Sequence, residues 1–169
     1  MRAHLAIALA LLAIPASAAN LLVDGDFEKG LEGWAVWGAR PDSAVVHGGK
    51  IACVASSLEN AWSGASQIVA VPGGTRRLVL SGWIQAESVK PGPEDWNKGR
   101  LWLDFLDERD SVTGGWQMVA GQAKGRIPWT RVERVYEVPA GAAKVKVMCA
   151  LANARGTFRC DDVELSPVP

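Results

Sequence analysis

The residues whose types and spacing favour ligand binding are tryptophans with polar residues two positions away. The segment 100–106 alternates apolar residues with Trp102 and Asp104, and an earlier segment does the same with Trp83 and Gln85. Alternate side chains of a strand point to opposite faces, so both pairs are expected opposite the core. A sugar stacks its C–H groups on a flat ring while its hydroxyls bond amide and carboxylate groups. With these two strands as neighbours, the pattern predicts a carbohydrate-binding platform.

Two further tryptophans extend this predicted site. Trp96 and Trp116 stand in segments expected to be loops on either side of the strand 100–106. The alternative is a sheet covered on both faces, in which these rings are simply buried. Trp34 and Trp129 stand beside glycine or proline at expected strand starts, and we expect them in the core.

Acidic residues gather near both ends of the chain: Asp24, Asp26 and Glu28 near the start, and Asp161 and Asp162 near the end. Strand ends bring the termini of a β-sandwich close together. Carboxylates from both ends, with loop carbonyls, would make the kind of oxygen site that Ca²⁺ takes. The alternative is that turn aspartates bond their own backbone, and spacing alone favours that alternative.

Catalytic motifs are lacking in the sequence. It contains no G-x-S-x-G, H-E-x-x-H, C-x-x-C or P-loop pattern. Glycosidases use two carboxylates that flank the scissile bond. The segment 104–110 is the candidate cluster, but its carboxylates other than Asp104 stand in a polar turn. We therefore expect a protein that is not an enzyme.

Three cysteines remain to be paired: Cys53, Cys149 and Cys160. The segments 144–152 and 157–165 are predicted to form a hairpin around a two-residue turn, which would place Cys149 opposite Cys160. Such neighbours can be bonded only in the non-hydrogen-bonded register. A disulfide and two buried reduced thiols both fit the sequence, and Cys53 is left over.

The elements that must position these residues are short strands. Alternating segments separated by Gly, Pro and Asn turns run along the chain, and no helical period is visible. Nine or so short strands indicate an all-β sandwich or barrel. The main expected strands are residues 20–23, 50–55, 66–71, 77–87, 100–107, 129–138 and the final hairpin.

Composition narrows the function classes. The chain has 169 residues, 49% of them hydrophobic, which suits one folded domain and excludes a disordered chain. Eighteen basic residues balance eighteen acidic ones. A nucleic-acid-binding protein would show a basic excess, and so would a protein bound electrostatically to a membrane surface. We expect neither partner.

The first eighteen residues have the pattern of a secretory signal. A basic start precedes an apolar run from Leu5 to Ile14, a proline and the cleavage pattern Ala16-Ser17-Ala18. The apolar run is about half of what a bilayer-spanning helix needs. The expected organisation is a signal peptide over residues 1–18, a domain over 19–169, and a secreted protein, extracellular or periplasmic.

A set of short motifs stands in order along the mature chain. The motifs are Asn20–Glu28 followed by Gly33-Trp34, then Ser66–Gly73, Leu80–Trp83, Tyr136–Pro139 and Gly156–Leu165. Their order resembles that in the carbohydrate-binding modules of families 4, 16 and 22, which are attached to secreted bacterial glycosidases. The resemblance covers essentially the whole mature chain.

The resemblance implies a galactose-binding-domain-like jelly roll with a structural Ca²⁺. Carried over by position, the ligands are the Asp26 carbonyl, Glu28, carbonyls of the 47–50 loop including that of Lys50, and Asp161. Two features depart from the pattern: Asp24 replaces the usual Asn before glycine, and cysteines in two core strands are unusual.

The sequence is therefore interpreted as a secreted, non-catalytic jelly-roll module that binds a poly- or oligosaccharide. The expected sugar-binding residues are Trp83, Gln85, Trp102, Asp104, Trp96 and Trp116. The alternative is a domain of the same fold that makes protein contacts in the cell envelope.

Overall fold

The computed structural model describes residues 19–50 and 52–168, so the expected signal peptide lies outside the described residues. Within this part of the chain there are eight strands and no helix, hence no helix that could cross a membrane. The strands are β1 (Ala35–Trp37), β2 (Ala39–Asp42), β3 (Ala52–Ala70), β4 (Arg77–Lys90), β5 (Gly99–Leu106), β6 (Val112–Ala123), β7 (Gly125–Glu137) and β8 (Lys144–Val168).

The strands form two layers with the core between them. One layer, called here the β5 layer, has the order β6, β5, the first half of β8, the second half of β3, and β1. The other, the β4 layer, has the order β7, β4, the second half of β8, the first half of β3, and β2. Within the described residues, these strands pair with one another in antiparallel fashion. The all-β jelly-roll sandwich expected from the sequence is confirmed.

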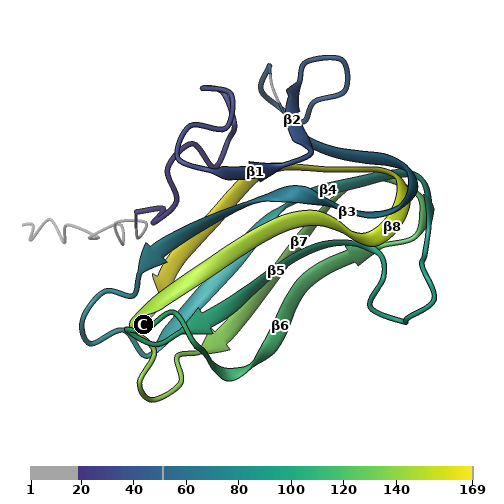
Figure 1. Cartoon of the computed structure of the whole chain (residues 1–169). Coiled ribbons are helices and arrows are strands. Elements are labelled where there is room, and N and C mark those ends of the chain that lie inside the picture. Colours follow the sequence, from purple (N-terminus) through teal and green to yellow (C-terminus); the bar gives the residue numbers. More distant parts are fainter. Residues whose placement is uncertain (1–18, 51, 169) are drawn as a thin grey trace, which may run out of the picture.

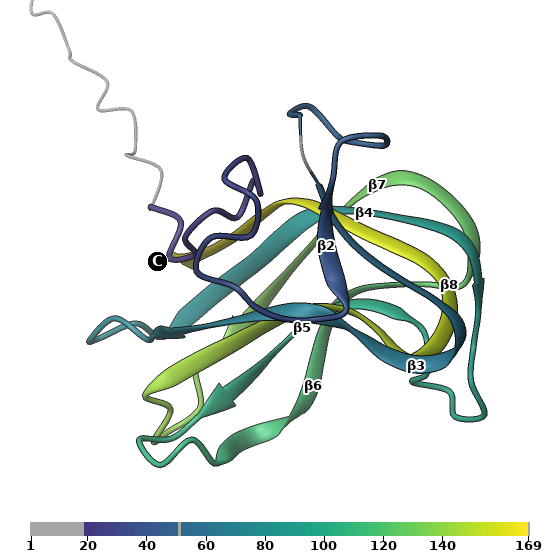
Figure 2. The ribbon, with the colours of Figure 1, turned by 45° about the horizontal axis from the view of Figure 1, so that its top comes forward.

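Two long strands belong to both layers. Figure 1 and Figure 2 show β8 bending back, with β3 beside it, so that each strand contributes one half to each layer. The bend of β8 contains Asn153 and Gly156, both with positive φ. The predicted hairpin is therefore wrong in detail: residues 144–152 and 157–165 do not pair with one another but lie in facing layers.

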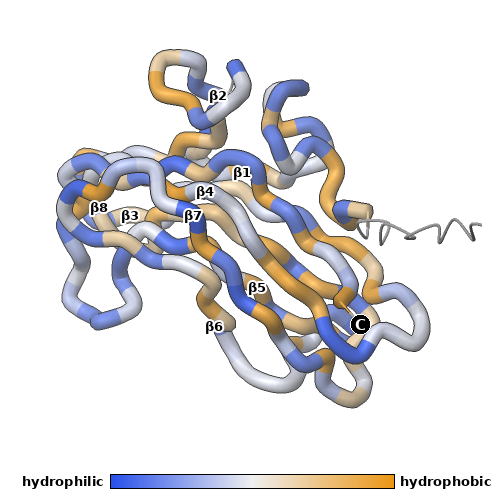
Figure 3. Tube along the Cα trace, turned by 180° about the vertical axis from the view of Figure 1, so that it is seen from behind, coloured by the Kyte–Doolittle hydropathy of each residue, from blue (hydrophilic) through white to orange (hydrophobic). Residues whose placement is uncertain are grey.

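The main core fills the space between the layers. Strand alternation directs Leu101, Leu103 and Phe105 of β5 into it, and Leu80 and Ile84 of β4 meet them from the other side. In Figure 3 hydrophobic and hydrophilic segments alternate along β7, as expected for a strand with one face on a core. The inward-pointing residues of β4 and β5 were correctly predicted from the alternation along these two strands.

The three cysteines lie in this core. Cys149 in the β5 layer is bonded to Cys160 in the β4 layer, so the disulfide ties the two layers together. Both residues are equally far from the β8 bend, which explains why the predicted pairing is confirmed although the hairpin is not. Cys53 is a buried free thiol and stands opposite Cys160 in the β3–β8 register.

The start of the described chain departs from the expectation. Residues 20–23 were predicted as a strand but form turns and bends, because the Asn20 side chain accepts the backbone N–H groups of Leu22 and Leu165. Trp34 lies in the main core with 6% of its surface exposed, as predicted.

Candidate functional site

The outer face of the β5 layer has a floor of small and flexible side chains. Register places Gly64 of β3 beside Ala150 of β8, and Ser66 beside Met148. These side chains point away from the main core, since the residues between them along each strand belong to it. A Cβ atom at Gly64 would lie only 2.3 Å from the Ala150 Cβ, so this position requires glycine. These four positions are themselves buried, so aromatic rings can pack directly on the sheet here.

Four tryptophans surround this floor, and we call them the tryptophan cluster: Trp37 of β1, Trp62 of β3, Trp96 of the β4–β5 loop and Trp102 of β5. The ring centroid of Trp62 lies 5.6 Å from that of Trp96 and 6.5 Å from that of Trp102. Trp102 is buried with Met148 and Ala150, and Trp37 packs against them. Trp62 is 45% exposed and Trp96 is 37% exposed, so these two rings face solvent while Trp102 supports them.

Polar groups continue this face along β5. The Arg100 guanidinium lies 5.5 Å from the Trp102 ring centroid and donates to the Gln117 side-chain oxygen. The Gln117 backbone N–H in turn donates to the Asp104 carboxylate. In the described part of the chain neither Arg100 Nε nor Trp102 Nε1 has a hydrogen-bond acceptor. The result is a chain of polar groups, anchored in β5 and β6, at the edge of the aromatic rings.

Burial sets the charges of this chain. It raises the pKa of Asp104, while the Gln117 N–H and the nearby Lys146, Trp102 and Arg100 oppose the rise. The Trp102 indole acts here without reaching hydrogen-bond geometry. Burial also lowers the pKa of Arg100, which the Asp104 charge partly offsets. Both groups are covered on the outer face, as all of β5 is, so the predicted exposed platform at Trp102 and Asp104 is wrong.

Trp116 lies at the far edge of the same layer. It was predicted in a loop but belongs to β6, where the pairing with β5 shifts register between Leu103 and Phe105. Gly114 and Gly115 precede it with positive φ, which favours glycine. The bulge leaves Trp116 77% exposed, as the most accessible tryptophan of the described chain.

The other two predicted sugar-binding residues lie on the opposite side of the molecule. Trp83 stacks on the His47 ring at a centroid distance of 3.8 Å, and Trp129 meets His47 edge-on at 5.8 Å. The Gln85 side-chain oxygen accepts a hydrogen bond from Arg159. Trp129, predicted in the core, is thus half-buried beneath a loop residue. Trp83 and Gln85 have protein partners where a sugar was expected.

The topology explains why Trp83 and Trp102 do not share a face. β4 pairs with β7 and β8, whereas β5 pairs with β6 and β8, so the two consecutive strands lie in different layers. Residues that point away from the core then point in opposite directions. The predicted single platform is wrong because consecutive strands of this jelly roll alternate between layers, which the alternation of side chains cannot reveal.

Sequence reasoning found part of the β5-layer face and missed part. Trp96, Trp102 and Asp104 were predicted and come together. Trp62 was missed because the segment 56–63 shows no alternation of apolar and polar residues. The one feature that could have indicated it is that this tryptophan stands directly before the small residues Ser63 and Gly64. The other missed residues are Trp37, Arg100, Gln117 and Met148.

The acidic residues meet at the 47–50 loop. The Asp161 carboxylate accepts the backbone N–H groups of His47 and Asp162 at 2.9 Å, and Glu28 accepts that of Lys50. Asp161 is only 1% exposed, and burial raises its pKa to about 6. The structure therefore brings Glu28, Lys50 and Asp161 to one loop, as their predicted common role requires.

The remaining acidic residues behave differently. Asp24 accepts the backbone N–H groups of Lys29 and Glu32 and so bonds its own turn, which was the alternative reading of its role. Asp26 is exposed. Within residues 19–50 and 52–168, no three His, Cys, Asp or Glu side chains are grouped to hold a metal ion. A metal at this loop would need backbone carbonyls among its ligands.

Comparison with known proteins identifies the fold. No protein-family model and no curated protein matches the sequence. Among solved structures, the chain is similar to a family 16 carbohydrate-binding module, with a TM-score of 0.62 and 21% identity over 86% of this chain and 99% of that one. The fold is that of carbohydrate-binding modules. The xylan-binding CBM22-1 domain of Paenibacillus barcinonensis Xyn10C gives a TM-score of 0.61 and 15% identity, over 90% of this chain and 96% of the other.

A part of an enzyme domain shares the fold as well. The enzymatically active domain of tailspike protein 4 from bacteriophage CBA120 gives a TM-score of 0.68 and 13% identity over 88% of this chain. This chain spans 21% of the length of that protein. At these identities the likeness shows the fold, and function depends on the residues of the face itself.

Proposed function

We propose that the protein is a secreted, non-catalytic carbohydrate-binding module that holds a poly- or oligosaccharide on the outer face of the β5 layer. The observation that carries the proposal is the pair of solvent-facing rings, Trp62 and Trp96, 5.6 Å apart above a floor of small residues. The two neighbouring rings together offer an exposed apolar surface on which sugar rings can stack.

The chemistry of this face suits a sugar. The C–H groups of a pyranose stack on tryptophan, and its hydroxyl groups need donors and acceptors at the ring edge. Gln117 stands there, held by the Arg100 guanidinium and by the buried Asp104 carboxylate. We infer binding rather than hydrolysis because Asp104 is buried and bonded, whereas a glycosidase needs two carboxylates that reach the scissile bond.

We also propose a structural Ca²⁺ at the 47–50 loop. Glu28 and Asp161 would supply carboxylates, and Asp26 and Lys50 would supply carbonyl oxygens, a donor set of the hard oxygens that Ca²⁺ prefers. The buried Asp161 supports the proposal, since a cation would stabilise the charge that burial disfavours. The ion would tie the start of the domain to β8.

A glycan array with the protein of residues 19–169 in the presence of Ca²⁺ tests the proposed function. We expect binding to a restricted set of poly- or oligosaccharides, with quenching of tryptophan fluorescence by the soluble ligand. The double variant Trp62→Ala/Trp96→Ala should lose both signals while it stays folded, since each half-exposed ring should cost about 1 kcal/mol or less of unfolding free energy. Failure of the wild-type protein to bind any glycan would contradict the proposal and favour the alternative, a protein-interaction domain of the same fold.

A further inference from the structure

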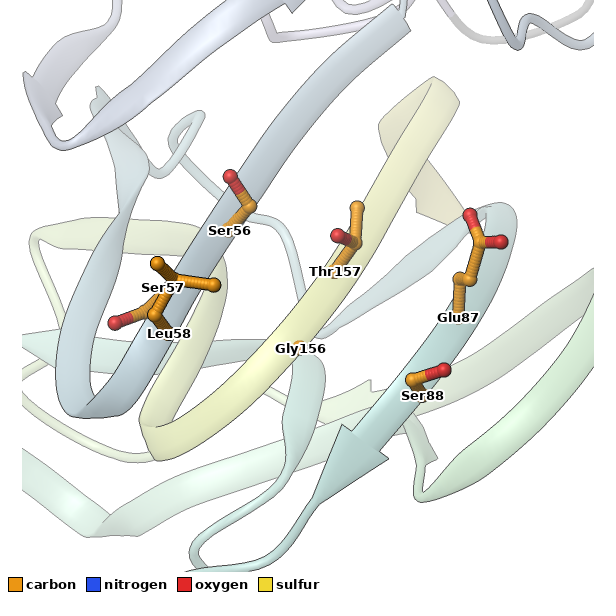
Figure 4. Close-up of a pocket in the computed structure, with 7 residues that line it drawn as sticks. All are labelled: Ser56, Ser57, Leu58, Glu87, Ser88, Gly156 and Thr157. Atoms are coloured by element: carbon orange, nitrogen blue, oxygen red, sulfur yellow. The ribbon is translucent and has the colours of Figure 1, made fainter.

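The β4 layer carries a hollow of its own, on the side opposite the tryptophan cluster. It has a volume of about 450 Å³ and lies where β3 and β8 pass from one layer to the other. Figure 4 shows the side chains of Ser56, Thr157 and Glu87 rising in one direction from three neighbouring strands. The lining is completed by Ser57, Leu58, Ser88 and Gly156.

The pairing of β3, β8 and β4 places the Ser56, Thr157 and Glu87 side chains in one row across the layer. Ser56 of β3 stands opposite Thr157 of β8, and Thr157 stands opposite Glu87 of β4. The residues that follow or precede them in each strand belong to the main core, so all three side chains point outward. In the described chain, the hydroxyl groups of Ser56, Thr157 and Ser88 have no hydrogen-bond partner, so they are free to bond a ligand.

The carboxylate at the end of the row is held in place. Glu87 lies 3.6 Å from the Arg159 guanidinium and 3.5 Å from that of Arg126. Arg159 is itself nearly buried and fixed by the Gln85 side chain. These two guanidinium groups each approach one Glu87 oxygen, and the side chain stays 45% exposed.

The backbone below the row is also specialised. Ser88 has a φ of 55° and Gly156 a φ of 113°, both in the region that L side chains rarely adopt. A Cβ at Gly156 would lie 2.5 Å from the Ser88 carbonyl oxygen, so glycine allows β4 and β8 to approach here. Strained backbone persists where the surroundings determine it, and it gathers at binding sites.

Leu58 supplies an apolar wall. It belongs to residues 58–60 of β3, which the β3–β8 pairing skips, and it is 95% exposed. A fully exposed leucine beside three free hydroxyls and a carboxylate matches a ligand with one apolar edge and several hydroxyl groups. We propose that the hollow is a second sugar site, which takes a single neutral pyranose whose vicinal hydroxyls bond Glu87 and Thr157.

The chemistry sets the selectivity of this second site. A carboxylate accepts hydrogen bonds from two adjacent hydroxyls at once, and bonds to an ionised acceptor are stronger than neutral ones. Because Arg159 and Arg126 already offset the charge of Glu87, bonding to hydroxyl groups sets this selectivity. Because the two sites lie on opposite layers, one molecule could hold two glycan segments and bridge them.

Amide chemical shifts during titration with methyl β-D-galactopyranoside, methyl β-D-glucopyranoside and methyl α-D-mannopyranoside test the proposal, with D-glucuronate as the acidic comparison. We expect at least one neutral glycoside to give saturable, millimolar shifts at Ser56, Ser88 and Thr157. Thr157→Val, which keeps the shape and removes the hydroxyl, should weaken binding about five- to tenfold, and Glu87→Gln about tenfold or more.

Two controls separate this site from the tryptophan cluster. Thr130→Val makes the same exchange at an exposed position of β7 and should titrate as the wild type. Trp62→Ala/Trp96→Ala should keep the shifts at Thr157 even if it loses every glycan of the array. The proposal is overturned if no neutral glycoside gives saturable shifts there, or if Thr157→Val binds as the wild type while its melting temperature is unchanged.

Discussion

The outer faces of the two layers use tryptophan in opposite ways. On the β5 layer, Trp62 and Trp96 face solvent, and Trp62 lies against the buried Trp102. On the β4 layer, Trp83 is covered by His47, whose backbone N–H is fixed by Asp161. The difference teaches that neither the number of tryptophans nor their place on a non-core face decides a site. What decides it is whether a neighbouring loop covers the ring.

The polar groups do not separate the two faces as the rings do. Beside Trp83, the Gln85 and Asp42 side chains are bound by Arg159. Within the described chain, Arg100 Nε and Trp102 Nε1 on the β5 layer have no acceptor, and neither have Arg159 Nε and Trp129 Nε1 on the β4 layer. A buried group without a partner is costly, and both faces carry this cost to the same extent, so the cover over the rings is what distinguishes them.

The largest expected effect distinguishes the buried ring of the tryptophan cluster from a ring that would contact the sugar. Trp102→Ala removes a ring that is 1% exposed and should cost about 3–5 kcal/mol of unfolding free energy. Trp62→Ala removes a half-exposed ring and should cost about 1 kcal/mol or less. Urea unfolding followed by circular dichroism measures both. Equal costs would mean that the two rings are covered alike.

The next largest expected effect is that of breaking the disulfide between the layers. Cys149→Ala breaks a bond between residues eleven apart and should cost about 3 kcal/mol. Cys53→Ala, the matched variant that keeps the bond, should cost about 1 kcal/mol. Equal losses in thermal unfolding would show that the bond does not stabilise the contact between the layers.

Thiol counting checks the same arrangement. The denatured, non-reduced protein should show one thiol per chain, that of Cys53. Because burial raises the pKa of the Cys53 thiol to about 12, iodoacetamide should not modify it in the folded protein. Three thiols would mean that the bond between the layers is not formed, and none would mean a covalent dimer.

These expectations show what the sequence alone can predict. Alternation along β5 correctly separates Leu101, Leu103 and Phe105 from Trp102 and Asp104, because a strand against a core repeats every two residues. The pairing of Cys149 with Cys160 is also predictable, since both are equally distant from the β8 bend.

The rest depends on contacts distant in sequence. The layer to which β4 or β5 belongs is set by pairing with β8, from 38 residues (Leu106 with Lys144) to 91 residues (Arg77 with Val168) away in the sequence. The cover over Trp83 comes from a loop before β3, and the partner of Trp96 is Trp62, in a polar run without alternation. No local pattern in the sequence indicates these long-range contacts.

Metal removal tests the proposed Ca²⁺ at the 47–50 loop, whose residue His47 covers Trp83 on the β4 layer. At about a hundredfold excess over Kd, a metal bound only by the folded state adds about 2.7 kcal/mol. EDTA should lower the melting temperature accordingly, and Glu28→Gln should abolish this sensitivity. Glu32→Gln, an exposed carboxylate of the same turn, is the control. An unchanged melting curve after metal removal, verified by elemental analysis, would refute the site.

A smaller effect concerns the charge of Asp104 on the β5 layer. Burial raises its pKa in the folded protein, so the folded state holds this proton more readily than the unfolded state. The contribution of Asp104 to stability should therefore grow as the pH falls from neutral towards its ordinary value. Compared with Asp104→Asn across this range, the wild type should gain stability on acidification. A constant difference would show that Asp104 is not desolvated.

The most direct test of the central assignment is isothermal titration of matched variants from the two layers with the strongest glycan of the array. Trp62→Ala removes an exposed ring of the β5 layer, and Trp129→Ala removes a half-buried ring that contacts His47 on the other side. We expect Trp62→Ala to weaken binding at least about tenfold, as for a central aromatic contact, and Trp129→Ala to bind as the wild type. Loss of affinity in Trp129→Ala, with Trp62→Ala unchanged, would place the sugar on the β4 layer and contradict the assignment.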